Sequence, residues 1–329
     1  MLAVLLALAA AAGYGSSDFA AGLAARRASV VRVTVLAEVA AAGLLLCVIP
    51  FVSSQAPSLT SVLWGTCAGA SGVAGAMALY LGFRHAAFSV ASSVSAVGTA
   101  AFSVLAGLAL GERPTALSLA GISLAVPAIV GVSAPARRAS RDPEPAVVGS
   151  QATAVLGQRG LGSPESSTGA APPGQRGPAG RRFRAAATGR HAAGVAWGLA
   201  AGAGFGLFFI GLNQAGSRTD LWPIVIAQLA AMVTVICVAA VTRDLRLPPA
   251  GTRRLSLLAG ATAAVGTATF FLATHHGLLA ITAVITSLYP AVTILLARAL
   301  LGERLTPLRV AGLCFAAASV ALIAAGGAG

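Results

Sequence analysis

Long apolar runs alternate with short polar segments along most of this chain. Many of the runs approach or exceed the roughly 20 residues that a helix needs to cross a bilayer. The pattern predicts an all-α integral membrane protein with ten transmembrane helices. We place the spans at about 2–22, 33–53, 61–82, 87–109, 115–133, 192–212, 222–241, 255–274, 278–300 and 307–326.

One long segment, residues 134–190, interrupts this series of spans. It consists mostly of Ala, Gly, Pro, Ser and Arg, and Phe183 is its only aromatic residue. A segment of this composition has too little apolar surface to bury a core. We therefore expect a flexible linker that joins a first half, residues 1–133, to a second half, residues 191–329.

A polar turn that begins Leu-Gly-Glu-Arg occurs twice, at 110–121 and at 301–312. Eight of its twelve positions are identical at an offset of 191 residues. Each copy lies between two apolar runs, and Thr306-Pro307 is typical of a helix start, as a glycine is of a helix end. A constant offset between two similar segments indicates an internal duplication.

The duplication also predicts how the two halves enter the membrane. Each half carries five spans, and an odd number places the second copy in the opposite orientation. The expected architecture is therefore two five-helix inverted repeats. Inverted repeats are common in secondary transporters, whose substrate sites lie where the repeats meet.

Composition supports the membrane assignment and excludes a soluble protein. The chain is 57% hydrophobic and 9% charged, with a mean hydropathy of +0.86, whereas soluble domains carry roughly 25% charged residues. All 22 basic residues are arginines, and the net charge is +13. The arginines lie at the edges of apolar runs and in the linker, so we expect no nucleic-acid partner.

The arginines also predict an orientation, because cytoplasmic loops are enriched in basic residues. The linker and the loops after spans 1, 3, 7 and 9 hold 20 of the 22 arginines. This distribution places the linker in the cytoplasm and both termini outside the cell.

The four cysteines fall inside apolar runs, where we expect them to behave as small, buried apolar side chains. They form neither a Cys-x-x-Cys pair nor a cluster with histidine, so the sequence predicts no disulfide, metal or other cofactor. No nucleophile-base pair is evident either, and we expect no enzymatic activity. The cysteines are Cys47, Cys67, Cys237 and Cys314.

Asp18 and Glu38 are the acidic residues that lie well inside predicted spans. Each lies about 9–12 Å from the same loop, at the 1.5 Å rise of a helix, so the two are expected to face each other or a common cavity. A carboxylate inside a membrane is costly and indicates function by default. Either the pair binds a proton or cation that couples transport, or it makes helix–helix hydrogen bonds. Gln228 occupies the position of Glu38 in the second half, which indicates a polar position facing a cavity.

A second group of candidate residues lies in the penultimate span of each half. Tyr289-Pro290 is mid-span, where proline kinks a helix, and broken helices line transporter sites. Ser95, Gly98 and Thr99 occupy the matching place in the first half. These residues either contact substrate or serve packing alone.

Aromatic residues of the first helix of each half are a third candidate group. Tyr14, Phe205, Phe208 and Phe209 either form the wall of a cavity or only pack. Glu112 and Glu303 of the repeated turn lie at the predicted membrane surface. For these two carboxylates we expect helix capping and local charge pairing, with gating as the alternative.

The repeated motif Leu-Gly-Glu-Arg-x-x-x-Leu-x-x-Ala-Gly, placed at the end of two five-span halves, resembles the EamA-type transporters of the drug/metabolite transporter superfamily. Pro290 also matches the mid-span proline of the family, and Thr99 departs from it. The resemblance covers both halves and excludes the linker. It implies movement of small metabolites, often efflux of amino acids or related compounds, without ATP. It also implies cytoplasmic termini, which conflicts with the arginine count.

These observations predict a multi-pass secondary transporter of the bacterial plasma membrane that works by alternating access. Its expected partners are a small-molecule substrate, membrane lipid and a coupling proton or cation; the oligomeric state is not indicated. The alternative is a non-transporting membrane scaffold or assembly partner.

Overall fold

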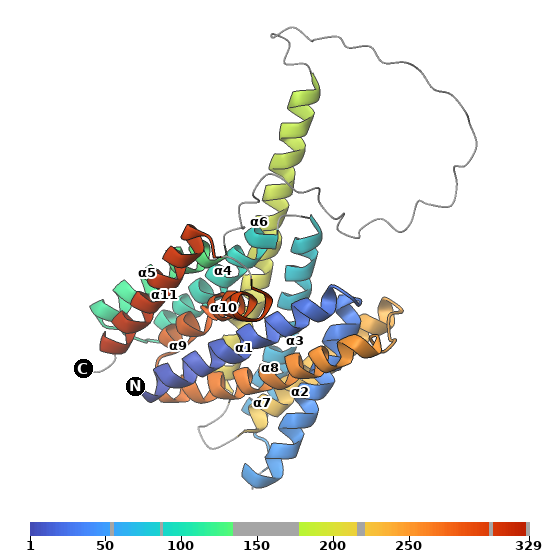
Figure 1. Cartoon of the computed structure of the whole chain (residues 1–329). Helices are drawn as coiled ribbons and strands as arrows, with labels where there is room; N and C mark the ends of the chain where they lie inside the picture. The colour runs from blue at the N-terminus through green and yellow to red at the C-terminus, as the bar shows by residue number, and fades with distance from the viewer. Residues whose placement is uncertain (53–55, 86–87, 134–177, 216–220, 303–304, 327–329) are drawn as a thin grey trace, which may run out of the picture.

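The computed structural model describes residues 1–52, 56–85, 88–133, 178–215, 221–302 and 305–326, and within these ranges every regular element is a helix (Figure 1). The helices are α1 (Leu2–Ala25), α2 (Val30–Val52), α3 (Leu59–His85), α4 (Phe88–Ala109), α5 (Ala116–Val132), α6 (Pro178–Gln214), α7 (Trp222–Val241), α8 (Ala250–His276), α9 (Leu279–Thr286), α10 (Tyr289–Leu301) and α11 (Pro307–Gly326).

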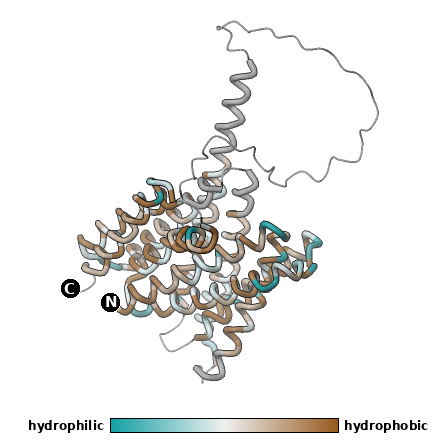
Figure 2. Tube along the Cα trace, viewed as in Figure 1, coloured by the Kyte–Doolittle hydropathy of each residue, from teal (hydrophilic) through white to brown (hydrophobic). Residues whose placement is uncertain are grey.

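The helices confirm the predicted all-α membrane architecture. In the described part of the chain, eight segments are long and apolar enough to span a bilayer, and two shorter apolar helices, Val94–Ala109 and Ala116–Val132, accompany them. Apolar residues follow the bundle, and polar ones gather where the helices end (Figure 2). One predicted span, 278–300, is divided into α9 and α10.

The boundary of the predicted linker differs from the structure. Helix α6 begins at Pro178, so residues 178–190 are helical rather than part of an irregular linker. Residues 134–177 lie outside the described residues.

The main contacts that a helix of the first half makes with the second half have counterparts in which the corresponding helix of the second half contacts the first half. Helix α1 packs on α8 as α6 packs on α3, and α2 packs on α8 as α7 packs on α3. Three further pairs, α2 with α7, α4 with α9 and α5 with α11, join helices that correspond to each other. This is the pairing that a two-fold relation between the halves produces. The opposite orientation of the halves in the bilayer stays a prediction.

Glycines allow the closest of these approaches, and they too occur in corresponding pairs. A Cβ at Gly13 would lie 2.7 Å from the Gly266 nitrogen, and one at Gly204 would lie 2.7 Å from the Gly75 nitrogen. Both pairs are the same contact at the offset of 191 residues. Small residues let helix backbones meet in this way in lipid, where van der Waals packing holds helices together.

The described residues of the repeated turn have the geometry that the sequence predicts, whereas Glu303 lies outside the described residues. Gly111 and Gly302 adopt positive φ angles of 89° and 68°, which glycine accommodates without steric cost at a helix end. Thr306 Oγ1 accepts a hydrogen bond from the Arg309 N–H at 3.3 Å, and α11 begins at Pro307. The expected cap and first-turn pair is confirmed.

The expectation of buried cysteines is wrong. All four thiols are free and exposed on the surface of the bundle. The apolar runs are hydrophobic around the whole helix, so the sequence does not reveal which face of each helix turns away from its neighbours.

Candidate functional site

Glu38 of α2 and Gln228 of α7 meet where the two halves touch. The Gln228 side-chain amide donates a hydrogen bond to the Glu38 carboxylate, and its nitrogen also lies 3.5 Å from the Glu38 backbone carbonyl oxygen. Gln228 is 6% exposed, and Glu38 is half-buried. Because these residues hold corresponding places in the two halves, a polar pair lies at the centre of the repeat interface.

Tyr14 of α1 adds a hydroxyl group near this pair. Its Oη lies 3.0 Å from Thr267 Oγ1 of α8, within hydrogen-bond distance. Glu38 is close enough to act electrostatically on the Tyr14 side chain. Four helices, two from each half, therefore supply a carboxylate, an amide and two hydroxyls to one region.

An aromatic cluster borders these polar groups. The ring of Tyr14 lies 6.2 Å from that of Phe209, which stacks on Phe270 with 4.0 Å between ring centroids. The ring of Phe208 also lies against Phe209, with 5.7 Å between ring centroids. Phe209 and Phe270 are fully packed in the core, so they form a wall beside the polar groups, whereas Tyr14 presents its hydroxyl to the other half.

Asp18 lies one turn beyond Tyr14 on the same face of α1, because residues four apart share a face of a helix. Its side chain is exposed. Among the described residues, no hydrogen bond or ion pair joins Asp18 to Glu38 or to any other side chain. Direct pairing of the two carboxylates is therefore absent from this conformation, and a shared cavity stays a prediction.

The predicted kink near Pro290 is a complete break. Helix α9 ends at Thr286, Ser287 and Leu288 form a turn, and Pro290 lies in the first turn of α10. Tyr289 packs against α1, since a Cβ at Gly15 would lie 2.6 Å from the Tyr289 carbonyl oxygen. The Ser287 hydroxyl is buried without a hydrogen-bond partner among the described residues. The break thus leaves polar groups of the second half against the first helix.

The corresponding segment of the first half, in α4, is an unbroken helix. Thr99 is buried, and its hydroxyl donates to the Ser95 carbonyl oxygen at 2.9 Å. The Ser95 hydroxyl is buried without a partner among the described residues. Gly98 lies against Gly202 of α6. Without a proline, the hydroxyl of Thr99 bonds within its own helix.

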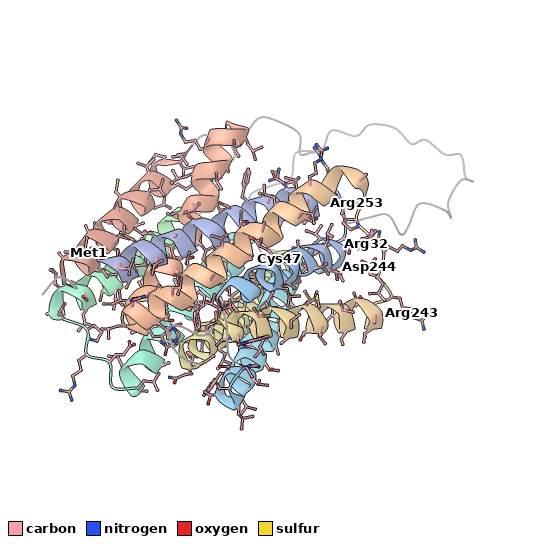
Figure 3. The ribbon with its side chains drawn as sticks, turned by 90° about the horizontal axis from the view of Figure 1, so that it is seen from below. Met1, Arg32, Cys47, Arg243, Asp244 and Arg253 are labelled. Carbon is pink, nitrogen blue, oxygen red and sulfur yellow. The ribbon has the colours of Figure 1, made fainter. Side chains whose placement is uncertain are left out.

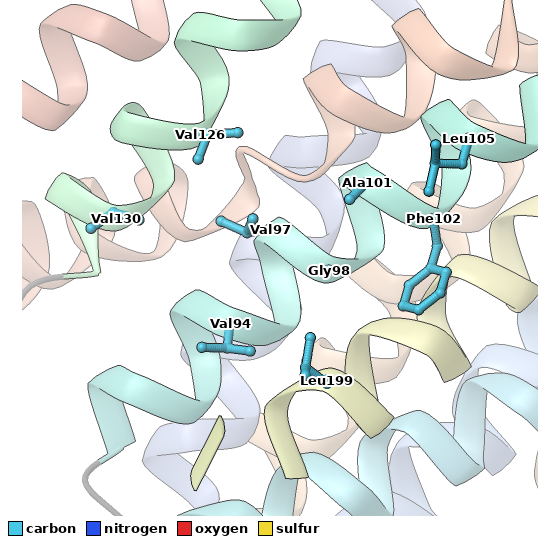
Figure 4. A pocket seen from close by; sticks show the side chains of 9 residues that line it. All are labelled: Val94, Val97, Gly98, Ala101, Phe102, Leu105, Val126, Val130 and Leu199. Carbon is cyan, nitrogen blue, oxygen red and sulfur yellow. The ribbon is translucent and has the colours of Figure 1, made fainter. Parts of the chain in front are cut away.

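Gly98 also lines a groove of about 380 Å³ between α4, α5 and α6 (Figure 4). Its lining side chains are all apolar, namely those of Val94, Val97, Ala101, Phe102, Leu105, Val126, Val130 and Leu199. Such a groove suits a hydrocarbon chain and offers no hydrogen bond to a polar substrate. The surroundings of Gly98 are therefore apolar, in contrast to those of the hydrogen-bonded Glu38–Gln228 pair.

Sequence reasoning missed Thr267, which completes the polar group. Thr267 follows Gly266, the glycine that packs on α1. Because α1 and α8 approach each other closely there, the Tyr14 hydroxyl lies within hydrogen-bond distance of Thr267. Threonine is frequent in apolar helices, and the Tyr14–Thr267 contact spans 253 residues of sequence. The helix–helix contact had to be known before Thr267 became recognisable.

Residues 192–325 match the model of the EamA-like transporter family. A solved crystal structure, titled "Crystal structure of protein", aligns with 96% of this chain and 98% of its own chain, with a TM-score of 0.65 and 12% sequence identity. At that identity the likeness shows a shared fold alone. Among curated protein sequences, none matches this chain.

Proposed function

Because this chain is an EamA-type member of the drug/metabolite transporter superfamily, we propose that it is a secondary active transporter that exports small metabolites, such as amino acids or related compounds, or drugs. The membrane is the bacterial plasma membrane, and the mechanism is alternating access between the two halves. Family membership and the apolar helices establish a multi-pass membrane transporter; substrate, direction and mechanism are the proposal.

The observation that carries the proposal is the polar group at the interface between the halves. Glu38 and Gln228 form a hydrogen bond between the corresponding helices α2 and α7, and Tyr14 and Thr267 lie within hydrogen-bond distance between α1 and α8, so both polar contacts join the two halves. An ionisable side chain inside a membrane is energetically costly, and for that reason it indicates a functional site by default. In an inverted-repeat transporter, a site at this interface is exposed to either side as the halves rock against each other.

Glu38 and Asp18 supply the proposed coupling to a proton or cation. Both are carboxylates on predicted membrane helices. An isolated negative charge is costly there, so binding of a cation or a proton is favourable. The Glu38 carboxylate already accepts a hydrogen bond from the Gln228 amide. Asp18 has no such partner among the described residues, so it is available to a cation that enters between the halves.

A growth screen tests the proposal and does not require the substrate to be identified first. Cells that overexpress the protein are challenged with amino acids, sugars, nucleosides and drugs at inhibitory concentrations. We expect protection against at least one compound, lost in Glu38→Gln and kept in Val39→Ala, which alters the neighbouring exposed side chain. Equal protection by wild type and Glu38→Gln would contradict the role of Glu38. No protection against any compound would favour the scaffold.

A further inference from the structure

The two halves are tied to each other by polar contacts at opposite ends of the bundle. The first tie is made by Glu112, in the turn after α4. Its carboxylate accepts hydrogen bonds from the backbone N–H groups of Leu279 and Ala280, the latter at 2.9 Å. These N–H groups belong to the first turn of α9, in the other half. Glu112 therefore caps a helix of the opposite half rather than its own.

Two features of the neighbouring residues accommodate the Glu112 carboxylate. Helix α9 has no cap from its own side chains, because Leu278 occupies its N-cap position. The free N–H groups of a helix start attract a negative charge. On the other side, a Cβ at Gly107 would lie 2.3 Å from Glu112 Oε2. Gly107 thus leaves the space that the carboxylate occupies.

Helix α9 is a short, wholly buried segment. All eight of its residues are buried, and it leads directly to the break at Ser287 and Leu288. Its start lies near the first residues of α1, since a Cβ at Gly277 would lie 2.6 Å from the Ala3 Cβ. The Glu112 tie therefore fixes α9 at the end of the bundle where α1 begins.

The second tie joins α2 to the loop between α7 and α8. Arg32 Nε donates to Asp244 Oδ1 at 2.5 Å, and the Ser29 hydroxyl donates to the other carboxylate oxygen. The hydrogen bond from Ser29 and that from Arg32 lower the pKa of the Asp244 carboxyl. Arg32 and Asp244 lie together at the end of the bundle opposite Met1 (Figure 3).

We propose that these two ties are the gate contacts of the transporter: Glu112 with α9 closes one end of the interface between the halves, and Asp244 with Arg32 closes the other. This inference rests on the proposed function, since gates imply alternating access. The halves cannot separate at either end while the tie there is intact. In this conformation both ties are formed, so each end opens only when its own tie breaks.

Cysteine accessibility tests the proposal without any need for flux. The native cysteines are replaced by alanine, and one reporter is introduced beside each tie: Ala280→Cys at the Glu112 end or Val33→Cys at the Asp244 end. Both native side chains are buried, at 0% and 2% exposure. The purified protein is placed in lipid nanodiscs, so a membrane-impermeant maleimide reaches both ends. The labelling rate then measures how often each end opens.

The variants are matched at each end. Glu112→Ala removes the cap, Glu112→Gln keeps one acceptor oxygen without the charge, and Arg113→Gln changes the exposed neighbour in the same turn. At the other end, Asp244→Asn weakens the tie, and Arg243→Gln changes its exposed neighbour.

We expect Glu112→Ala to raise labelling at Ala280→Cys by roughly twofold to thirtyfold, the range for loss of a helix cap, and Glu112→Gln to raise it less. Val33→Cys should be unaffected. Asp244→Asn should raise labelling at Val33→Cys alone, and both controls should behave as wild type. Unchanged labelling at the tied end, or an equal rise at both ends, would overturn the gate assignment. If Glu112→Ala does not fold, Glu112→Gln and Asp244→Asn decide the outcome. End-specific labelling without flux of any solute would instead contradict the proposed function.

Discussion

Replacing Gly260 with alanine should destabilise the protein by forcing the two halves apart. A Cβ at Gly260 of α8 would lie 2.1 Å from the carbonyl oxygen of Ala37 on α2. Real Cβ atoms essentially never approach closer than 3.0 Å, so the helices must separate by roughly 0.9 Å (3.0 minus 2.1). The obstacle is backbone, which cannot rotate away as a side chain can.

The magnitude follows from two opposing effects. Overpacking costs about 1–3 kcal/mol, and a backbone clash belongs at the upper end of that range. Alanine recovers up to about 1 kcal/mol through its greater helix propensity. The net loss is about 2 kcal/mol, or roughly 4–8 °C in Tm on the scale of a 150–250-residue domain.

Thermal unfolding of detergent-solubilised protein, followed by the loss of the monodisperse size-exclusion peak, measures this effect. Gly43→Ala is the matched control, because Gly43 lies on α2 and a Cβ added there would have nothing within 4 Å. It should leave Tm unchanged or raise it. Gly69→Ala should behave like Gly260→Ala, since its Cβ would lie 2.0 Å from the Ala227 oxygen. A Gly260→Ala protein as stable as Gly43→Ala would refute the reasoning.

Three further outcomes follow from the same contacts. Tyr14→Phe and Thr267→Val each remove one hydrogen bond and should each cost about 1 kcal/mol of stability; the double variant should cost little more than either single variant, and additive losses in thermal unfolding would contradict the contact. Glu38→Gln should flatten the dependence of transport on pH, and an unaltered flux profile would exclude Glu38 from coupling. Because hydrogen bonds lower the folded-state pKa of Asp244, its tie contributes fully above the unfolded pKa of about 3.9 and is lost as pH falls through the lowered pKa. Labelling at Val33→Cys, corrected for thiolate fraction, should therefore be constant from pH 5 to 8, and a rise within that window would refute this assignment.

The spans and turns were predictable because their signals are local. An apolar run in lipid must pair its own backbone N–H and C=O groups, and a single segment can do so only as a helix. The break before Pro290 follows from the proline itself, and Gly111 and Gly302 follow from the need for positive φ at a helix end. The correspondence of Glu38 with Gln228 was visible from the offset between the halves, and the hydrogen bond between them completes it.

The contacts that depend on helix rotation were not predictable. Tyr14 reaches Thr267, and Glu112 reaches Leu279, across distances in sequence that no local pattern encodes. Nearly uniform hydrophobicity around each helix also conceals which face is packed, and for that reason the sequence predicts buried cysteines although all four are exposed. The sequence predicts helix capping and local charge pairing for Glu112, with gating as the alternative, but only the fold shows that the capped helix is α9 of the other half.

Solute flux into proteoliposomes is the most direct test of the central claim. Purified wild-type protein is reconstituted, and uptake of a broad panel of labelled amino acids, nucleosides, sugars and drug-like cations is compared with protein-free liposomes, with and without a proton gradient. Our account predicts gradient-dependent movement of at least one solute by wild type, abolished or strongly reduced in Glu38→Gln, whose fold is verified by an unchanged size-exclusion profile. Flux of every solute at the protein-free level, from protein that is correctly folded, would contradict it.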